Sequence, residues 1–170
     1  MIISNSKNWK SFHEEAIKLN KYPKYPQELM LKTIFGQNSK SDLLLNKKSK
    51  IIDVGCRFGN NLIPYLDLGC DVFGVEINKE ICSVTKKILG KKFPNRNITC
   101  KIGNNREIPF KDDYFDLLVT NTHHYENSLE NIHKALKEYK RVLKKNKFLY
   151  LTTTANKHEF FKKTKKLSKN

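Results

Sequence analysis

The chain has 170 residues and carries 33 lysines and arginines against 17 aspartates and glutamates, a formal net charge of +16. This length suits one domain around one hydrophobic core. No apolar stretch is long enough to cross a bilayer, and the N-terminus lacks the apolar run of a signal peptide, so we expect a cytoplasmic protein. Only four of the basic residues are arginine, which favours lysine-rich background usage over a phosphate-binding surface. A nucleic-acid partner stays open but is not favoured.

The cysteines are Cys56, Cys70, Cys82 and Cys100, and no C-x-x-C pair occurs among them. No histidine stands at zinc-finger spacing from them either. We therefore expect free thiols in a reducing compartment and no metal site.

The N-terminal part of the chain, residues 1–46, is expected to be a helical extension. Helices are expected at Ser11–Leu19 and Gln27–Phe35, on either side of the segment KYPKYP. This extension is either a lid over a cofactor site or an ordinary packing extension, and the sequence leaves both interpretations open.

Residues 47–156 alternate short apolar runs with amphipathic helical patterns. Residues 157–170 follow as a basic helix or tail. The apolar runs are too short for helices and rich in residues that favour strands. We expect strands at Ile51–Val54, Val72–Glu76, Ile98–Lys101, Phe115–Thr120 and Phe148–Thr153.

Helices are expected between these strands. A short helix follows Gly59, with Pro64 near its start. Asn78 is the expected N-cap of the next helix, and Gly90 is its expected end. Asn127 is the expected N-cap of the last helix, with Glu130 completing a capping box. The apolar stripe of that helix consists of Leu129, Ile132, Ala135, Leu136, Tyr139, Val142 and Leu143.

Strand–helix alternation of this kind predicts an α/β fold, a Rossmann-like doubly wound sheet of parallel strands with helices on both faces. Ligands of such sheets bind beyond the carboxyl ends of the strands. We therefore expect the site in the loops after Val54, Glu76, Lys101 and Thr120.

The first of these loops, in the stretch IIDVGCRFGNNL, contains Gly55 and Gly59. Asp53 stands two residues before the first glycine, where its carboxylate would repel the diphosphate of a dinucleotide. A cationic cofactor such as S-adenosylmethionine suits this position better. Glu76 ends the next strand, where a carboxylate can accept hydrogen bonds from both ribose hydroxyls. The two carboxylates together favour S-adenosylmethionine over NAD.

Here the chain resembles the class I S-adenosylmethionine-dependent methyltransferases, in particular the group called methyltransferase domain 11. The resemblance spans about Ile51 to Thr154. It implies a methyltransferase with the parallel strand order 3-2-1-4-5 and S-adenosylmethionine as cofactor. The matching stretches are IIDVGCRFGNN, VFGVEIN, KIGNNREIPFKDDYFDLLVTN and ALKEYKRVLKKNKFLYLTT.

The resemblance also implies the cofactor-binding residues. Asp53 is the acid of the first motif, and the backbone of Gly55, Cys56 and Gly59 lies against the methionine moiety. Glu76 is the ribose acid.

The remaining implied contacts come from three later loops. Ile77 packs on the adenine, Asn104 accepts from the adenine amino group, and the Asn105 N–H meets the ring. Asn121 stands where the family uses backbone carbonyls to hold the methionine ammonium.

Three departures from the family pattern stand out. Arg57 replaces the middle glycine of the loop, and either pairs with the methionine carboxylate or points to solvent. Asn104 replaces the usual acid. Few residues follow Thr154, so we expect the usual last antiparallel strands to be missing from this sequence. The chain is then a fragment or a shortened form, or a homodimer or a partner chain covers the fifth-strand edge.

The segment N-T-H-H-Y-E after the fourth strand is expected beside the reactive methyl group. His123 and His124 are the candidate catalytic bases, and Tyr125 can line an acceptor pocket; a packing or capping role for either histidine stays open. The segment lacks the N-P-P-Y turn of amino-methylating nucleic-acid enzymes and the cysteine of cytosine-C5 enzymes.

Three functions therefore remain. The first is a methyltransferase for a small molecule, with a sugar or glycan precursor indicated by the resemblance of KYPKYPQELM to a surface-polysaccharide subgroup, in which Tyr25 would approach the cofactor. The second is a methyltransferase for RNA or another nucleic acid. The third is a cofactor-binding partner protein without catalytic activity.

Overall fold

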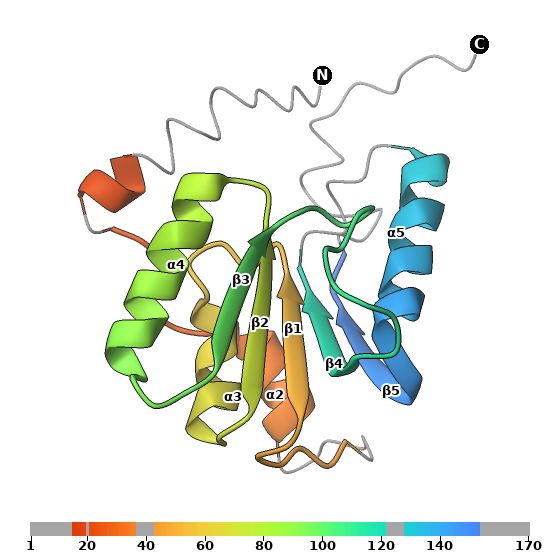
Figure 1. The fold of residues 1–170 in the computed structure, drawn as a ribbon, viewed down its shortest axis with the longest axis horizontal. Coiled ribbons are helices and arrows are strands. Elements are labelled where there is room, and N and C mark those ends of the chain that lie inside the picture. The colour runs from red at the N-terminus through yellow and green to blue at the C-terminus, as the bar shows by residue number, and fades with distance from the viewer. Residues whose placement is uncertain (1–14, 20, 37–42, 122–127, 154–170) are drawn as a thin grey trace.

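A computed structural model describes residues 15–19, 21–36, 43–121 and 128–153 (Figure 1). Within these residues five strands form one parallel sheet in the order β3-β2-β1-β4-β5. The Rossmann-like fold and its strand order are thereby confirmed. The strands are β1 (Lys50–Val54), β2 (Asp71–Glu76), β3 (Ile98–Ile102), β4 (Phe115–Thr120) and β5 (Leu143–Leu151).

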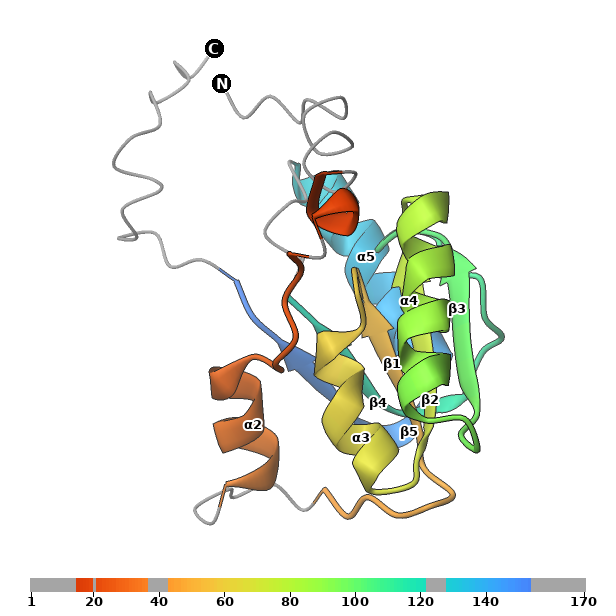
Figure 2. The same cartoon turned by 90° about the vertical axis from the view of Figure 1, so that its left-hand side faces the viewer.

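Helices cover both faces of the sheet, and Figure 2 shows α2 to α4 on one side and α5 on the other. The alternation along each strand explains this, because Ile51 and Leu117 belong to the core on the first face, whereas Ile52 and Leu118 belong to the core on the second. The helices are α2 (Glu28–Phe35), the 3₁₀ turn η1 (Asn60–Leu62), α3 (Ile63–Asp67), α4 (Lys79–Lys92) and α5 (Leu129–Val142).

Helix α4 begins where the sequence predicts and ends later. The Asn78 side chain accepts hydrogen bonds from the N–H groups of Glu80 (2.8 Å) and Ile81 (3.1 Å), which confirms the predicted N-cap. The prediction that Gly90 ends the helix is wrong, because α4 continues to Lys92. Phe93 is the C-cap, and Pro94 disfavours helical backbone at this preceding residue.

The structure corrects three predictions about helix α5 and strand β5, which follow one another without a loop. The N-cap is Ser128, whose hydroxyl accepts from the Asn131 N–H at 3.1 Å, and not Asn127, which lies outside the described residues. Leu143 opens β5 and does not extend the helix, because its backbone is already extended. Strand β5 therefore runs over Leu143–Leu151 and not Phe148–Thr153.

The described part of the N-terminal segment packs against α4 and the loop after β1. Residues 15–18 form one helical turn, and the Tyr22 ring stacks on the Phe58 ring with centroids 5.0 Å apart. Ala16 and Ile17 join the same cluster, which includes Ile81 of α4. Among the described residues, no helix combines the length and apolarity needed to span a bilayer.

Candidate active site

The loop after β1 turns sharply at the carboxyl edge of the sheet. The N–H groups of Gly55 and Cys56 both donate to the Val75 carbonyl of β2, at 2.8 and 3.0 Å. Gly55 (φ 79°) and Gly59 (φ 74°) both adopt left-handed backbone, which favours glycine. A Cβ at Gly59 would also lie 2.7 Å from Leu89 Cδ1 in α4. Glycine at this position therefore lets the loop approach α4 closely.

Asp53 lies in β1, under this loop, and its side chain is 1% exposed. Its Oδ2 atom has no hydrogen-bond partner among the described residues. Burial, together with the nearby Glu76 carboxylate, raises the pKa of Asp53 from 3.8 to about 7, and a hydrogen bond from Asn61 opposes this shift only in part. A buried carboxylate oxygen of this kind can accept a cationic or hydrogen-bonding partner.

Glu76 ends β2 and faces the same loop. Its carboxylate accepts from the Arg57 N–H and from the Asn78 N–H, both at 3.0 Å. Glu76 is therefore held between the loop after β1 and the start of α4, where a carboxylate can meet a ribose.

Asn61 connects this site with the N-terminal segment, which the sequence analysis missed. Its side chain hydrogen-bonds to the Asp53 carboxylate, and its Oδ1 atom accepts from the Gln27 N–H at 3.0 Å. The neighbouring Asn60 donates to the Tyr25 carbonyl at 2.8 Å. The Tyr25 side chain itself is 82% exposed.

Arg57 occupies the middle of the loop with left-handed backbone (φ 47°), a conformation that costs energy for any residue with a side chain. The buried Thr85 of α4 donates its hydroxyl to the Arg57 carbonyl. Thr85 therefore helps to hold the loop, a role that its place on the inner face of a helix does not reveal in the sequence.

The Cys56 side chain turns away from the loop into the core. Its sulfur lies 3.8 Å from that of Cys100, and Cys82 donates to the same Cys100 sulfur at 2.9 Å. Gly74 makes room for this cluster, because a Cβ there would lie 2.6 Å from the Cys56 sulfur. Cys56 thus offers its backbone, and not its thiol, to a ligand in the loop. In the described part of the chain no cluster of three or more His, Cys, Asp or Glu side chains suits a metal ion.

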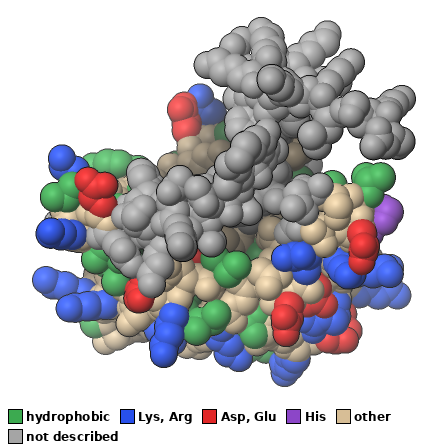
Figure 3. Space-filling view, turned by 90° about the horizontal axis from the view of Figure 1, so that it is seen from above, with side chains coloured by type: hydrophobic (Ala, Val, Ile, Leu, Met, Phe, Trp, Pro, Cys, Tyr) green, Lys and Arg blue, Asp and Glu red, His purple; other side chains and the backbone are tan. Residues whose placement is uncertain are grey.

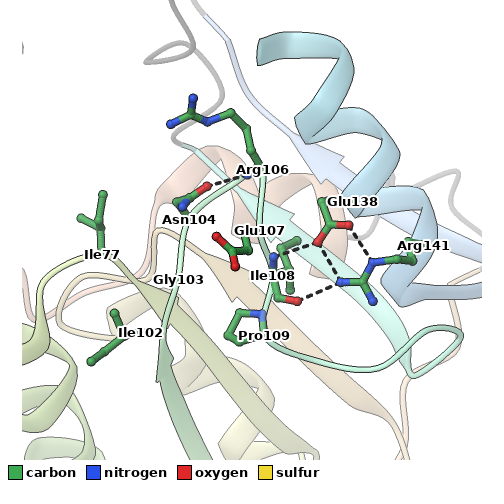
Figure 4. A pocket seen from close by; sticks show the side chains of 10 residues that line it. All are labelled: Ile77, Ile102, Gly103, Asn104, Arg106, Glu107, Ile108, Pro109, Glu138 and Arg141. Atoms are coloured by element: carbon green, nitrogen blue, oxygen red, sulfur yellow. Dashed lines mark hydrogen bonds and ion pairs between the residues drawn. The ribbon is translucent and has the colours of Figure 1, made fainter. Parts of the chain in front are cut away.

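The loop after β3 borders an open cavity of about 580 Å³ (Figure 4). Ile77 is 73% exposed and Ile102 is 53% exposed, and both line this cavity. The Asn104 Oδ1 atom accepts from the Arg106 N–H at 2.8 Å, which orients the amide and leaves the oxygen a second lone pair. Asn105 is buried. Of the residues expected at the adenine, Ile77 and Asn104 line this cavity, which does not include the glycine loop.

The last predicted residues follow β4. The Asn121 Oδ1 atom accepts from the Thr152 hydroxyl at 2.7 Å, so this side chain ties the end of β4 to the end of β5. His123, His124 and Tyr125 lie outside the described residues. The structure therefore brings Asp53, Glu76 and the glycine loop together at one edge and leaves the catalytic bases as predictions.

Comparison with known proteins independently supports the family resemblance seen in the sequence. A family model described as a methyltransferase domain matches residues 52–151, more than half of the chain. The chain belongs to this methyltransferase family. The match begins within β1 and ends with β5, so it covers the whole described sheet.

Individual relatives of the chain agree with the family match. A methyltransferase, C1B3.06c of Schizosaccharomyces pombe, is 32% identical over 108 residues, which are 59% of this chain and 38% of the relative. The methyltransferase YcgJ of Bacillus subtilis is 26% identical over 99 residues, 57% of this chain and 37% of YcgJ. This methyltransferase chain therefore spans less than half the length of these two relatives.

Solved structures show the same fold. YcgJ of Bacillus subtilis superposes with a TM-score of 0.56 at 24% identity, over 71% of this chain and 47% of that one. A chain from the complex of the Haloferax volcanii Trm112 methyltransferase activator superposes with a TM-score of 0.55 at 20% identity, over 65% of this chain and 47% of that one.

Proposed function

We propose that this methyltransferase chain binds S-adenosylmethionine at the carboxyl edge of its sheet and transfers the methyl group to a small-molecule acceptor. The observation that carries the proposal is the buried Asp53 oxygen without a hydrogen-bond partner among the described residues, directly under a two-glycine loop. The ammonium group of the cofactor can supply the positively charged partner that this carboxylate lacks.

The other residues of the edge fit the same cofactor. The backbone of Gly55 and Gly59 is free of side chains where the methionine moiety approaches, and Glu76 is placed to accept from the ribose. The exposed Ile77 offers an apolar surface to the adenine. When bound, S-adenosylmethionine supplies an electrophilic methyl group, and the protein then has to align an acceptor and remove its proton.

For the acceptor side we propose His123 and His124 as candidate bases, because in the sequence they closely follow Thr120, the last residue of β4. Sugars are the first acceptors to screen, on the sequence pattern around Tyr25. None of the relatives named above carries a sugar or glycan in its name, so this narrower assignment rests on that pattern. A partner subunit is also proposed, because one structurally similar chain was solved with the Trm112 activator.

The described part of one face of the molecule gives no support to a nucleic-acid acceptor. Figure 3 looks onto the carboxyl edge, where lysines and arginines are spread around the rim with acidic side chains between them. Nucleic-acid-binding proteins usually gather basic side chains on one face.

Calorimetric titration with S-adenosylmethionine and S-adenosylhomocysteine tests the proposal. We expect both ligands to bind, and the variants Asp53→Asn and Glu76→Ala to lose binding. Asp116→Asn is the matched control, because it also removes a buried carboxylate but lies at the amino end of β4, away from the loops. A folded wild-type chain that binds neither ligand would show the proposal to be wrong.

A further inference from the structure

Arg141 of α5 uses its whole guanidinium group to hold the loop after β3. Its Nη1 atom donates to the Phe110 carbonyl (2.8 Å) and to Asp112 Oδ1 (2.6 Å). Its Nη2 atom donates to the Ile108 carbonyl (2.8 Å) and to Glu138 Oε2 (2.7 Å), and its Nε atom donates to Glu138 Oε1 (2.6 Å). These bonds match the five N–H donors that an arginine has.

Glu138 completes the arrangement from the preceding turn of the same helix. Its Oε2 atom also accepts from the Ile108 N–H at 2.8 Å, so both backbone groups of Ile108 are bonded to the pair. The hydrogen bonds from Arg141 lower the pKa of Glu138, which keeps the pair charged. The Arg141 carbonyl accepts from the Asp113 N–H at 2.9 Å, one more connection to the loop.

The loop held in this way, residues 103–114, has no helix or strand of its own. Its first part carries Asn104 and Asn105, the residues proposed to read the adenine. In that part the Gly103 N–H donates to the Glu76 carbonyl at 3.1 Å, and a short bridge joins Asn104 and Glu107. Arg106 Nη1 donates to Asn131 Oδ1 of α5 at 3.1 Å, so this part is tied to the same helix. Figure 4 shows Ile77 and Ile102 on one side of this loop and Glu138 with Arg141 on the other.

We propose that Arg141, together with Glu138, is a positioning residue that sets the recognition of the adenine base by fixing loop 103–114 in place. This inference rests on the proposed function. The base is read by hydrogen bonds whose partners lie on the loop, and the loop takes its place from α5. An error of about 1 Å in such a placement is costly for recognition.

The alternative is that Arg141 and Glu138 merely stabilise the fold. A second, partly buried network allows a positioning role to be distinguished from this structural role. Lys144 donates to both oxygens of Asp116 at 2.9 Å, at the amino end of β4. This network resembles the first in charge and in its partial burial. Its described hydrogen bonds join Asp116 to Lys144 of β5 and to the Lys50 N–H of β1, and not to loop 103–114. Lys144→Gln is therefore the matched control for lost stability without lost positioning.

The experiment measures the dissociation constants of S-adenosylhomocysteine and S-inosylhomocysteine by calorimetry. Hypoxanthine carries an oxygen where adenine carries the amino group, so its affinity reports on the hydrogen bonds to the base. We expect wild type to prefer adenine by roughly tenfold or more. Arg141→Lys keeps the charge but lacks the fork of donors, and its preference should fall several-fold toward equality. Lys144→Gln should lower the melting temperature and keep the wild-type preference.

Asp112→Asn provides a milder variant if Arg141→Lys does not fold, because Asp112 is largely exposed and the substitution removes only the charge of one partner of Arg141. Its preference for adenine should be intermediate. Wild-type preference retained in the folded Arg141→Lys and Asp112→Asn variants, or equal losses in Lys144→Gln, would overturn the inference. A wild-type chain that binds neither ligand would overturn the proposed function itself.

Discussion

At the scale of single residues, Asp53 couples ligand binding to protonation. Its pKa of about 7 in the free protein means that the carboxyl is largely protonated below neutral pH. A cationic ammonium needs the ionised form, so binding releases a proton at low pH. We expect the affinity for S-adenosylhomocysteine to fall below pH 7, by up to about tenfold per pH unit.

Calorimetry between pH 5.5 and pH 8, in buffers of different ionisation enthalpy, checks this prediction through the number of protons released. Affinity independent of pH over this range would contradict it.

The same carboxylate should reduce the stability of the free protein. Because its pKa rises from 3.8 in the unfolded chain to about 7 on folding, the folded state binds the extra proton, and stability is lost as pH rises from about 4 to 7. We expect Asp53→Asn to raise the melting temperature of the ligand-free protein at pH 8, and to raise it less at pH 5. Thermal unfolding at both values measures the difference, and an equal shift at the two would contradict the assignment.

Arg57 is the residue whose backbone conformation least suits its side chain. Arg57→Gly relieves a left-handed conformation and should stabilise the protein by about 1 kcal/mol. The substitution also removes a positive charge beside a cationic cofactor, so S-adenosylmethionine should bind at least as tightly. Urea unfolding and calorimetry measure the two effects. Loss of cofactor binding in a stable Arg57→Gly variant would instead assign the arginine to the methionine carboxylate.

At the scale of elements, Gly59, which lies beside α4, and Gly90, which lies within it, should respond in opposite ways to substitution by alanine. A Cβ at Gly59 would contact Leu89 and Thr85 at less than 3 Å and would also need left-handed backbone, whereas Gly90 has open space around it. We expect Gly59→Ala to destabilise the protein by roughly 1–3 kcal/mol. Gly90→Ala should stabilise it by about 1 kcal/mol, because the helix runs through this position.

Urea unfolding measures the free energy of unfolding of both variants, and each variant is the control for the other. A stabilised Gly59→Ala variant would mean that the loop and α4 do not pack as closely as described.

The two ends of helix α4 are set by different kinds of interaction. Asn78 caps α4 by accepting from the N–H groups of two residues in the first turn, a local interaction that is therefore readable from the sequence. Gly90 does not end α4, because the helix packs on β2 and β3 through Leu89 and stops only at the constraint from Pro94. In α4, local signals thus located the start of the helix better than its end.

At the scale of the whole molecule, the net charge of +16 has a testable consequence. Lysines spread over the surface should bind RNA weakly and without sequence preference, and this binding should largely disappear between about 50 and 200 mM salt. Fluorescence anisotropy with two unrelated RNA oligonucleotides measures it. A complex that survives at 200 mM salt and prefers one sequence would favour the nucleic-acid methyltransferase alternative.

Much of the architecture could be read from the sequence, because it depends on local periodicity. Apolar runs of strand length alternating with amphipathic helices predicted the parallel sheet, and parallel strands must present their carboxyl ends at one edge. Asp53 and Glu76 could therefore be placed together although 23 residues separate them. The glycine pattern of the loop was equally readable, since left-handed backbone favours glycine.

Contacts between segments that lie far apart in the sequence were revealed only by the tertiary structure. Arg141 meets Ile108 and Asn61 meets Gln27 across more than 30 residues, and no periodicity along the chain encodes such pairs. Strand β5 starts at Leu143 because pairing with Phe115 of β4 captures a residue that continues the apolar stripe of α5. Local pattern thus specified the elements and the edge that they share, and long-range packing chose which polar side chains hold the loops of that edge in position.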